Sequence, residues 1–176
     1  MKTLSSKVIY ENKWMTLRED AIERDSGAEG IYSVVEKPPF VVILAVQNQQ
    51  VYLVQQYRYP IKARCWELPQ GAWEARPDAS PEILAAGELR EETGLSANTW
   101  QYLGEQYLAY GFCNQVYHVF FATGLTQGKN ALDPEEEDLI CKAFSLTEFE
   151  DMIRSGEIKD ATTVNAFGLA RLHELL

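Results

Sequence analysis

The stretch GELREETGL, residues 87–95, places three carboxylates within five positions of a predicted helix. Glu88, Glu91 and Glu92 should lie on one face, because residues three and four apart are neighbours on a helix. They occupy the last turn before Gly94, a glycine suited to a left-handed helix stop, where anions are disfavoured by about 0.3–1 kcal/mol. A hard divalent cation such as Mg²⁺ would compensate this charge through carboxylate oxygens. The alternative is a solvated acidic face that binds nothing.

The composition predicts a folded globular domain. The chain has 176 residues, of which 46% are hydrophobic and 24% charged, as in an ordinary globular enzyme of one domain. Its formal net charge of -10 argues against a nucleic-acid partner, because phosphate backbones are bound by clustered lysine and arginine. A substrate that carries phosphate would therefore need a bridging metal.

The sequence contains no apolar run long enough to cross a bilayer, and residues 1–13 lack the apolar stretch of a signal peptide. We therefore expect a cytoplasmic protein with no membrane partner. The three cysteines are odd in number and lack metal-type spacing, so we expect reduced packing residues: Cys65, Cys113 and Cys141.

The first part of the chain predicts a small sheet of its own. Residues 7–36 alternate between polar and apolar around a turn-forming DSGAEG, and Pro38 and Pro39 end this run. We expect residues 1–38 to form an N-terminal strand segment and residues 39–176 to form the main domain.

The main domain is predicted to consist of strands around one central helix, followed by two further helices. The central helix should begin with Ser80 as N-cap and Pro81 as first residue, and end at Gly94. Thr147 with Glu150 is expected to form the capping box of the next helix. Strands are expected over residues 40–46, 51–60, 101–110, 115–124 and 139–146, and the last helix over 162–175. This order predicts an α/β fold without a βαβ repeat.

From ELPQG to GELREETGL, the chain resembles the Nudix hydrolases, whose signature is G-x5-E-x7-R-E-U-x-E-E-x-G-U, with U an aliphatic residue. Gly71 opens this box, and its second half is complete from Glu88 to Leu95. This spacing, in a strand, loop and helix context, seldom arises by chance. The resemblance therefore involves the same glutamates that the helix places on one face.

Two positions depart from this signature. The distance from Gly71 to Glu88 is two residues longer than in the pattern. The position of the first glutamate therefore falls at Ala79 or, counted from the box glycine, at Pro77. The arginine position holds Gly87, and a glycine inside a helix costs about 0.5–1 kcal/mol relative to alanine. Both positions are chiefly structural in the family, so we expect changes in loop geometry rather than in the metal-binding triplet.

The resemblance implies the Nudix fold, an α/β (α+β) architecture with a mixed central sheet between helices and a small N-terminal antiparallel sheet. It also implies hydrolysis of a nucleoside diphosphate linked to another group, assisted by Mg²⁺ or Mn²⁺. Such ions neutralise a diphosphate and lower the pKa of a bound water. The implied ligands are Glu88 and Glu92, with Glu91 on a second ion, and the backbone carbonyl of Gln70.

Other segments resemble the branch of this family that hydrolyses ADP-ribose and nucleoside diphosphate sugars. The segment QQYRYP, residues 55–60, carries this resemblance and implies that Arg58 contacts the substrate. Residues 108–122 lie where this branch contacts a terminal ribose, which implies Gly111 and Phe112 as substrate residues. GEIKDATTVNAFGLA, residues 156–170, resembles the C-terminal signature of the branch.

Further candidates follow from the same resemblance. DPEEEDLI resembles the loop that supplies the general base, with Glu137 as first candidate and Glu135 as second. Glu91 is the third catalytic candidate. Trp14 could stack on the nucleobase, with a core or interface tryptophan as the alternative.

The leading hypothesis is a Mg²⁺-dependent diphosphatase that cleaves ADP-ribose, or another nucleoside diphosphate sugar, into a nucleoside monophosphate and a sugar phosphate. The branch also implies a homodimer formed through residues 1–38. The alternatives in the same class are GDP-mannose, other sugar nucleotides and dinucleoside polyphosphates. Two alternatives belong to other functional classes. One is a Nudix-fold sensor that binds ADP-ribose-like ligands without turnover, and the other is an acidic structural domain that binds no metal.

Overall fold

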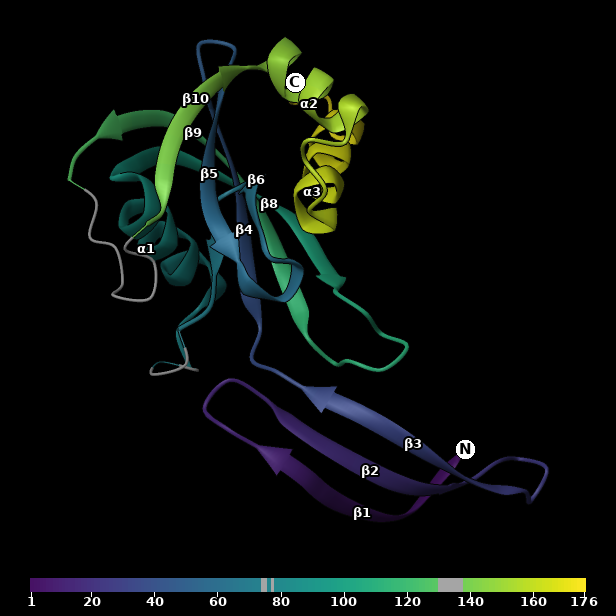
Figure 1. The fold of residues 1–176 in the computed structure, drawn as a ribbon. Helices are drawn as coiled ribbons and strands as arrows, with labels where there is room; N and C mark the ends of the chain where they lie inside the picture. Colours follow the sequence, from purple (N-terminus) through teal and green to yellow (C-terminus); the bar gives the residue numbers. More distant parts are fainter. Residues whose placement is uncertain (74–75, 77, 130–137) are drawn as a thin grey trace.

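The computed structural model describes residues 1–73, 76, 78–129 and 138–176, and consists of a small sheet below a larger α+β body (Figure 1). Three antiparallel strands in the order β1-β2-β3 form the small sheet, which confirms the predicted N-terminal sheet. Their bounds are Lys2–Glu11 for β1, Thr16–Glu23 for β2 and Glu29–Glu36 for β3.

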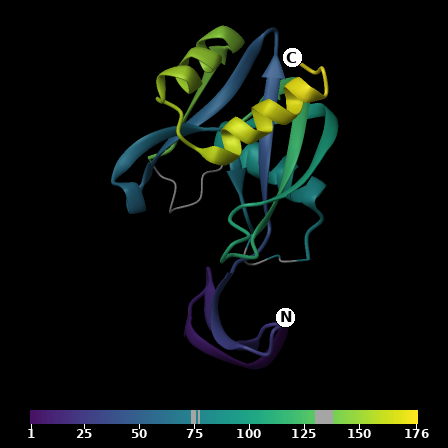
Figure 2. The same ribbon diagram turned by 90° about the vertical axis from the view of Figure 1, so that its right-hand side faces the viewer.

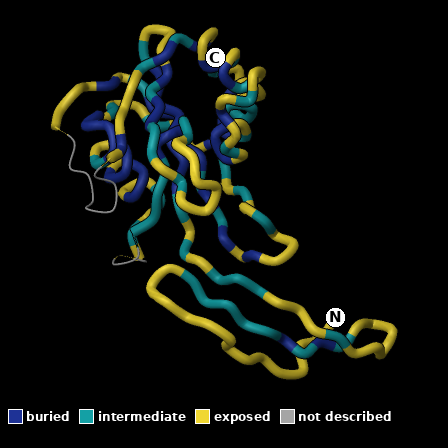
Figure 3. Tube along the Cα trace, in the orientation of Figure 1, coloured by how far each residue is buried: buried dark blue, intermediate teal, exposed yellow. Residues whose placement is uncertain are grey.

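The small sheet is joined to the larger body by backbone hydrogen bonds. The Val35 amide donates to the Phe112 carbonyl at 2.8 Å, and the Asn114 amide donates to the Val35 carbonyl at 3.1 Å. The Tyr32 hydroxyl also donates to the Gly111 carbonyl at 2.8 Å. Most of the sheet is otherwise exposed, as the tube in Figure 3 shows.

The larger body contains a mixed sheet whose main path runs β10-β5-β4-β9-β8, with β4 and β9 parallel and the other neighbours antiparallel. This confirms the mixed central sheet. The bounds are Phe40–Gln47 for β4, Gln50–Arg58 for β5, Leu95–Tyr107 for β8, Val116–Gln127 for β9 and Ile140–Ser145 for β10. A short 3₁₀ helix covers Tyr59–Ile61.

Strands β4 and β5 separate soon after their shared turn. Their ladder contains the pairs Val46 with Val51 and Gln47 with Gln50. Farther along, β4 pairs instead with β7, Gln70–Gly71, while β5 pairs with β6, Ala63–Glu67. The segment from β6 to β7 thus fills the space between two diverging strands.

Helices cover both faces of this sheet, as the fold prediction required (Figure 2). Successive side chains of β4 point to opposite faces of the sheet. Ile43 packs in the hydrophobic cluster that contains α1, and Leu44 packs in the cluster that contains α2 and α3. Helix α1 covers Pro81–Thr93, α2 covers Leu146–Ser155 and α3 covers Ala161–Leu172. Among the described residues, no helix is long and apolar enough to span a membrane.

The predicted start and stop of α1 are confirmed. The Ser80 hydroxyl accepts a hydrogen bond from the Ile83 amide at 3.4 Å, and Pro81 is the first residue. Gly94 has φ +73° and its amide donates to the Arg90 carbonyl at 2.9 Å. Strand β8 then begins directly at Leu95, six residues before the predicted strand at residue 101, because this leucine is buried against α1.

The predicted capping box of α2 was wrong. Ser145, rather than Thr147, is the N-cap, and its hydroxyl accepts from the Glu148 amide at 3.2 Å. The Glu148 carboxylate accepts from the Ser145 amide at 2.8 Å. Glu150 forms ion pairs with Arg154 and Arg171 instead, so the helix begins two residues earlier than predicted.

This assignment can be tested with two alanine variants. Ser145→Ala removes the hydroxyl that accepts from the first turn of α2 and should lower the free energy of unfolding by about 1 kcal/mol. Thr147→Ala changes an exposed side chain outside the cap and should leave it nearly unchanged. Urea denaturation followed by circular dichroism measures both, and a larger loss for Thr147→Ala would contradict the observed cap.

Candidate active site

Two buried glutamates of α1 lie against strand β7. The Glu92 carboxylate accepts a hydrogen bond from the Gln70 amide at 3.0 Å through Oε2. Glu88 lies so close to Gly71 that a Cβ there would lie 2.6 Å from its Cδ, so a side chain at this position would displace the carboxylate. Glu92 is fully buried and Glu88 nearly so. The opening glycine of the box therefore makes room for a carboxylate.

The third glutamate of the triplet reaches the next part of the same segment. Glu91 is half-buried, and its Oε2 accepts a hydrogen bond from the indole nitrogen of Trp73 at 3.1 Å. The three predicted metal ligands thus contact one short stretch of chain, residues 70–73, from a single helix face.

These donors have the chemistry that a hard divalent cation prefers. Buried carboxylates are expensive without a compensating charge, and Mg²⁺ and Mn²⁺ take carboxylate and carbonyl oxygens. Within the described ranges, however, no three histidine, cysteine, aspartate or glutamate side chains converge closely enough to hold a metal ion. The site fits a cation held by one or two carboxylates with backbone oxygen and water, as is usual for Mg²⁺.

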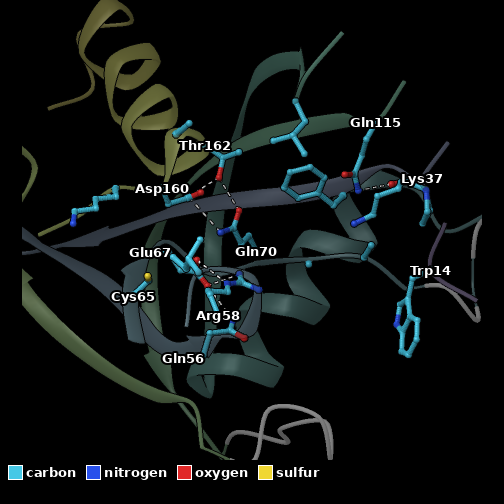
Figure 4. A pocket seen from close by; sticks show the side chains of 18 of the residues that line it. Trp14, Lys37, Gln56, Arg58, Cys65, Glu67, Gln70, Gln115, Asp160 and Thr162 are labelled. Atoms are coloured by element: carbon cyan, nitrogen blue, oxygen red, sulfur yellow. Dashed lines mark hydrogen bonds and ion pairs between the residues drawn. The ribbon is translucent and has the colours of Figure 1, made fainter. Parts of the chain in front are cut away.

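A cavity of about 630 Å³ opens beside this stretch (Figure 4). Gln70, Gly71 and Ala72 form part of its wall, so the cavity and the glutamates share the same backbone. The other walls come from β5 and β6, from the start of α3, from the loop after β8 and from the turn after β1, with lining residues that include Lys13, Trp14, Lys37, Gln56, Arg58, Glu67, Leu108, Gln115, Lys159, Asp160 and Thr162.

The cavity concentrates positive charge in an acidic protein. Among the residues that the structure describes, two acidic side chains line it, Glu67 and Asp160. Four basic side chains of the described part do so, Lys13, Lys37, Arg58 and Lys159, although the whole chain has 16 basic and 26 acidic residues. This reversal of sign indicates a site for an anionic ligand.

Arg58 is held in place by a buried carboxylate. Its Nε donates to Glu67 at 3.1 Å, a second nitrogen is ion-paired with the same carboxylate, and Gln56 donates to it at 3.0 Å. Burial raises the pKa of Glu67 above its ordinary value, while the charge of Arg58 and its hydrogen bond lower it in part. The Arg58 side chain remains 39% exposed, so it can bind a ligand while Glu67 orients it.

The side chain of Gln70 belongs to the cavity wall, although the sequence pointed to its backbone carbonyl alone. Its amide nitrogen donates to Asp160 Oδ2 at 3.4 Å, and its oxygen accepts from the Thr162 hydroxyl at 2.8 Å (Figure 4). Asp160 Oδ2 also caps α3 by accepting from the Thr163 amide at 2.8 Å. Sequence reasoning missed these residues, although the DATT segment before a predicted helix carries the signal of an aspartate N-cap.

A second contact links α3 to the box through the buried Thr163. Its hydroxyl donates to Asp160 Oδ2 at 2.7 Å and accepts from the Leu68 amide at 2.9 Å. The stretch before the box is therefore tied to α3, while Glu92 ties it to α1.

The structure brings Trp14 to the cavity but not Gly111 or Phe112. Trp14 lies in the turn between β1 and β2, 44% exposed, with the Lys13 ammonium 4.2 Å from its ring centroid. It lies at one side of the cavity, away from Asp160 (Figure 4). Gly111 and Phe112 use their carbonyls to hold β3, and neither is among the described residues that line the cavity.

Glu135 and Glu137, the predicted candidates for the general base, lie outside the described residues. The next residue, Asp138, is held to β6 by Arg64, which donates to its carbonyl at 2.8 Å and forms an ion pair with its carboxylate.

Comparisons with known proteins agree with this geometry. A nucleoside diphosphate sugar hydrolase N-terminal domain matches residues 1–35, and a NUDIX domain matches residues 36–167. An ADP-ribose pyrophosphatase of Mycobacterium tuberculosis is 33% identical over 93% of this chain and 79% of its own length, and one of Bacillus subtilis is 30% identical over 99% and 95%. The crystal structure of an ADP compounds hydrolase has the same fold, with a TM-score of 0.86 over 97% of this chain and 91% of its own, at 20% identity.

The link between α3 and the box predicts the effect of Thr163→Val. This change leaves the buried Leu68 amide without its acceptor and should lower the free energy of unfolding by about 1–3 kcal/mol. Thr162→Val is the matched control and should cost less, because Gln70 and Asp160 line a cavity that water can enter. Equal losses in denaturant titrations would contradict the assigned role of Thr163.

Proposed function

The chain belongs to the NUDIX hydrolase family, and we propose that it hydrolyses the diphosphate bond of ADP-ribose to AMP and ribose 5-phosphate. The observation that carries this proposal is the shared wall at residues 70–72: glutamates of the box lie behind it and a cavity rich in basic side chains lies in front. A diphosphate bound in this cavity would lie between Arg58 and the glutamates that bind the cation.

In this proposal Glu88 and Glu92 bind one metal ion together with the Gln70 carbonyl, and Glu91 binds a second ion. Hydrolases of this family generally depend on a divalent metal, and Mg²⁺ or Mn²⁺ suits these oxygen donors. When bound, the metal would neutralise the diphosphate and lower the pKa of a water molecule. The chain's own part is to hold the carboxylates by the hydrogen bond from Gln70 and the close approach at Gly71.

The cavity walls suggest how the rest of the substrate binds. A volume of about 630 Å³ lies within the usual range for small-molecule sites. Arg58, oriented by Glu67, would contact a phosphate, and Trp14 would stack on the base with about 1–3 kcal/mol. All hydrogen bonds of the Asp160 carboxylate to described residues involve Oδ2, so Oδ1 could accept from a sugar hydroxyl.

The general base is proposed to be Glu137, with Glu135 as second candidate, from the family resemblance of their segment. A carboxylate near the reacting water can remove its proton as the water attacks phosphorus. Glu91 is the remaining candidate, because it is the least buried glutamate of the triplet.

The preference for ADP-ribose is supported by the two ADP-ribose pyrophosphatases that match nearly the whole chain. GDP-mannose, other sugar nucleotides and dinucleotides are the alternatives in the same reaction class. A sensor that binds such ligands without turnover is the alternative of another class.

A substrate panel tests the proposal. ADP-ribose, GDP-mannose, UDP-glucose, diadenosine polyphosphates and NADH are incubated with Mg²⁺, with Mn²⁺ and without metal, and products are separated by chromatography. We expect metal-dependent AMP from ADP-ribose at the highest rate. No product from any compound, with ADP-ribose still raising the melting temperature, would favour the sensor instead.

Replacing Glu92 separates the reaction from the fold. In Glu92→Gln the side-chain oxygen of the new glutamine can still accept a hydrogen bond from the backbone amide of Gln70, while the negative charge is lost. We expect turnover to fall by orders of magnitude with little change in melting temperature. Glu82→Gln, on the exposed first turn of the same helix, should retain the activity. Unchanged turnover in Glu92→Gln would contradict the mechanism.

We also propose that two chains form a dimer through the small sheet. Strand β1 lies at its edge, all ten of its residues are exposed, and Val8, Ile9 and Tyr10 are each at least half exposed. A long exposed edge that carries such apolar side chains favours pairing with another strand, and a second copy supplies a complementary one.

Light scattering after size exclusion tests the dimer. Wild type should have twice the mass of one chain, and Val8→Asp should shift it toward the monomer because a charge would be buried in the interface. Leu172→Asp, at an exposed leucine of α3, serves as control and should remain dimeric. A monomeric wild type would contradict the proposal.

A further inference from the structure

Trp73 packs on helix α1 at the position where the box departs from its signature. A Cβ at Gly87 would collide with Cζ2 and Cη2 of the Trp73 ring and lie 3.1 Å from its Cε2. Any larger side chain at this position would therefore displace the indole. The glycine inside the helix, which costs helix stability, is explained by the aromatic ring that lies on it.

The same indole is aimed at a glutamate of the triplet. One helical turn after Gly87, Glu91 Oε2 accepts from the indole nitrogen at 3.1 Å. The Arg76 guanidinium lies 4.7 Å from the ring centroid, which adds a cation–π contact to the packing on α1. The ring is thus held by several contacts while its one polar atom points at a carboxylate.

We propose that Trp73 is a positioning residue for the metal site: its N–H fixes Oε2 of Glu91 and leaves Oε1 to bind a divalent cation. Gly87 serves the same purpose by making room for the ring. This inference rests on the proposed function, because it concerns the metal that the diphosphatase would use. Without this role, the contact between Trp73 and Gly87 would be explained by packing alone.

The physical basis is the hydrogen bond to a ligand carboxylate. Groups that hydrogen-bond metal ligands fix their orientation, and their loss typically lowers metal affinity or activity by about 10–100-fold. Glu91 is half-buried and lies on the helix beside two more buried carboxylates, so repulsion among them would otherwise turn it toward solvent. The neutral indole donor holds it near the site without adding a charge that competes with the cation.

Trp73→Phe tests this role because phenylalanine keeps an aromatic ring over Gly87 but has no N–H. Calorimetric titration with Mn²⁺ in the absence of substrate should show about tenfold weaker binding than wild type. The Mn²⁺ concentration for half-maximal hydrolysis of ADP-ribose should rise by a similar factor. The melting temperature without metal should change little, which separates positioning from folding.

Trp100→Phe is the matched control. Its indole nitrogen donates to the Ala97 carbonyl at 3.2 Å, so the substitution removes the same kind of hydrogen bond outside the box. We expect Mn²⁺ affinity in this variant to equal that of wild type.

Gly87→Ala supplies the opposite structural change. Alanine favours the helix relative to glycine but displaces the indole, so Mn²⁺ affinity should fall although the helix itself is stabilised. In the Trp73→Ala background the same substitution should have no further effect on Mn²⁺ binding, because no ring remains to be displaced.

The outcomes distinguish this inference from the proposed function. Wild type that neither binds Mn²⁺ nor hydrolyses any nucleotide overturns both. Wild type that binds Mn²⁺ and hydrolyses ADP-ribose, with Trp73→Phe binding Mn²⁺ equally well, overturns the positioning role alone. Weaker binding in Trp73→Phe and Gly87→Ala, but not in Trp100→Phe, supports it.

Discussion

A hydrogen bond from a backbone amide to a buried carboxylate connects the main parts of this molecule. Glu92 is fully buried on α1 and accepts from the Gln70 amide, in the short strand between the diverging β4 and β5. A buried carboxylate without such a donor would be strongly destabilising, so this contact restricts how helix and strand can pack. The position of the cavity wall depends on it.

The stretch just before the box is held from the other face of the sheet as well. Thr163, on α3, accepts from the Leu68 amide and donates to Asp160, which caps the same helix. Helices on opposite faces therefore meet the same few residues of chain. A change in the packing of either helix would be transmitted to the cavity wall, because this stretch has little room to move independently.

The charge distribution follows from the same arrangement. Acidic side chains of α1 lie behind residues 70–73, whereas basic side chains outnumber acidic ones among the described residues that line the cavity in front. In a protein with a net charge of -10, an anionic ligand would be repelled from most of the surface. A cation between the glutamates and the ligand would compensate the negative charge of both. This accounts for the acidic end of α1, which is unfavourable for the folding of the helix alone.

Local patterns could be read correctly where neighbours in the chain decide the structure. The caps of α1 and its glutamate face depend on residues within one or two turns, and both were predicted. The cap of α2 shows the limit of such patterns. In SLTEFE, both Ser145 with Glu148 and Thr147 with Glu150 have the spacing of a capping box. Burial of Leu146 in the core favours the first of them.

By itself, then, the sequence determined the acidic helix, its bounds and the resemblance to a family, because these depend on short spacings, and the mixed α+β fold followed from that resemblance. Tertiary structure decided which residues contact one another in the site. The contact between Leu68 and Thr163 joins residues 95 positions apart, and Trp73 meets Gly87 and also Glu91, which lies 18 positions after Trp73 along the chain. Such contacts follow from how the helices pack on the sheet, and no local pattern contains that information.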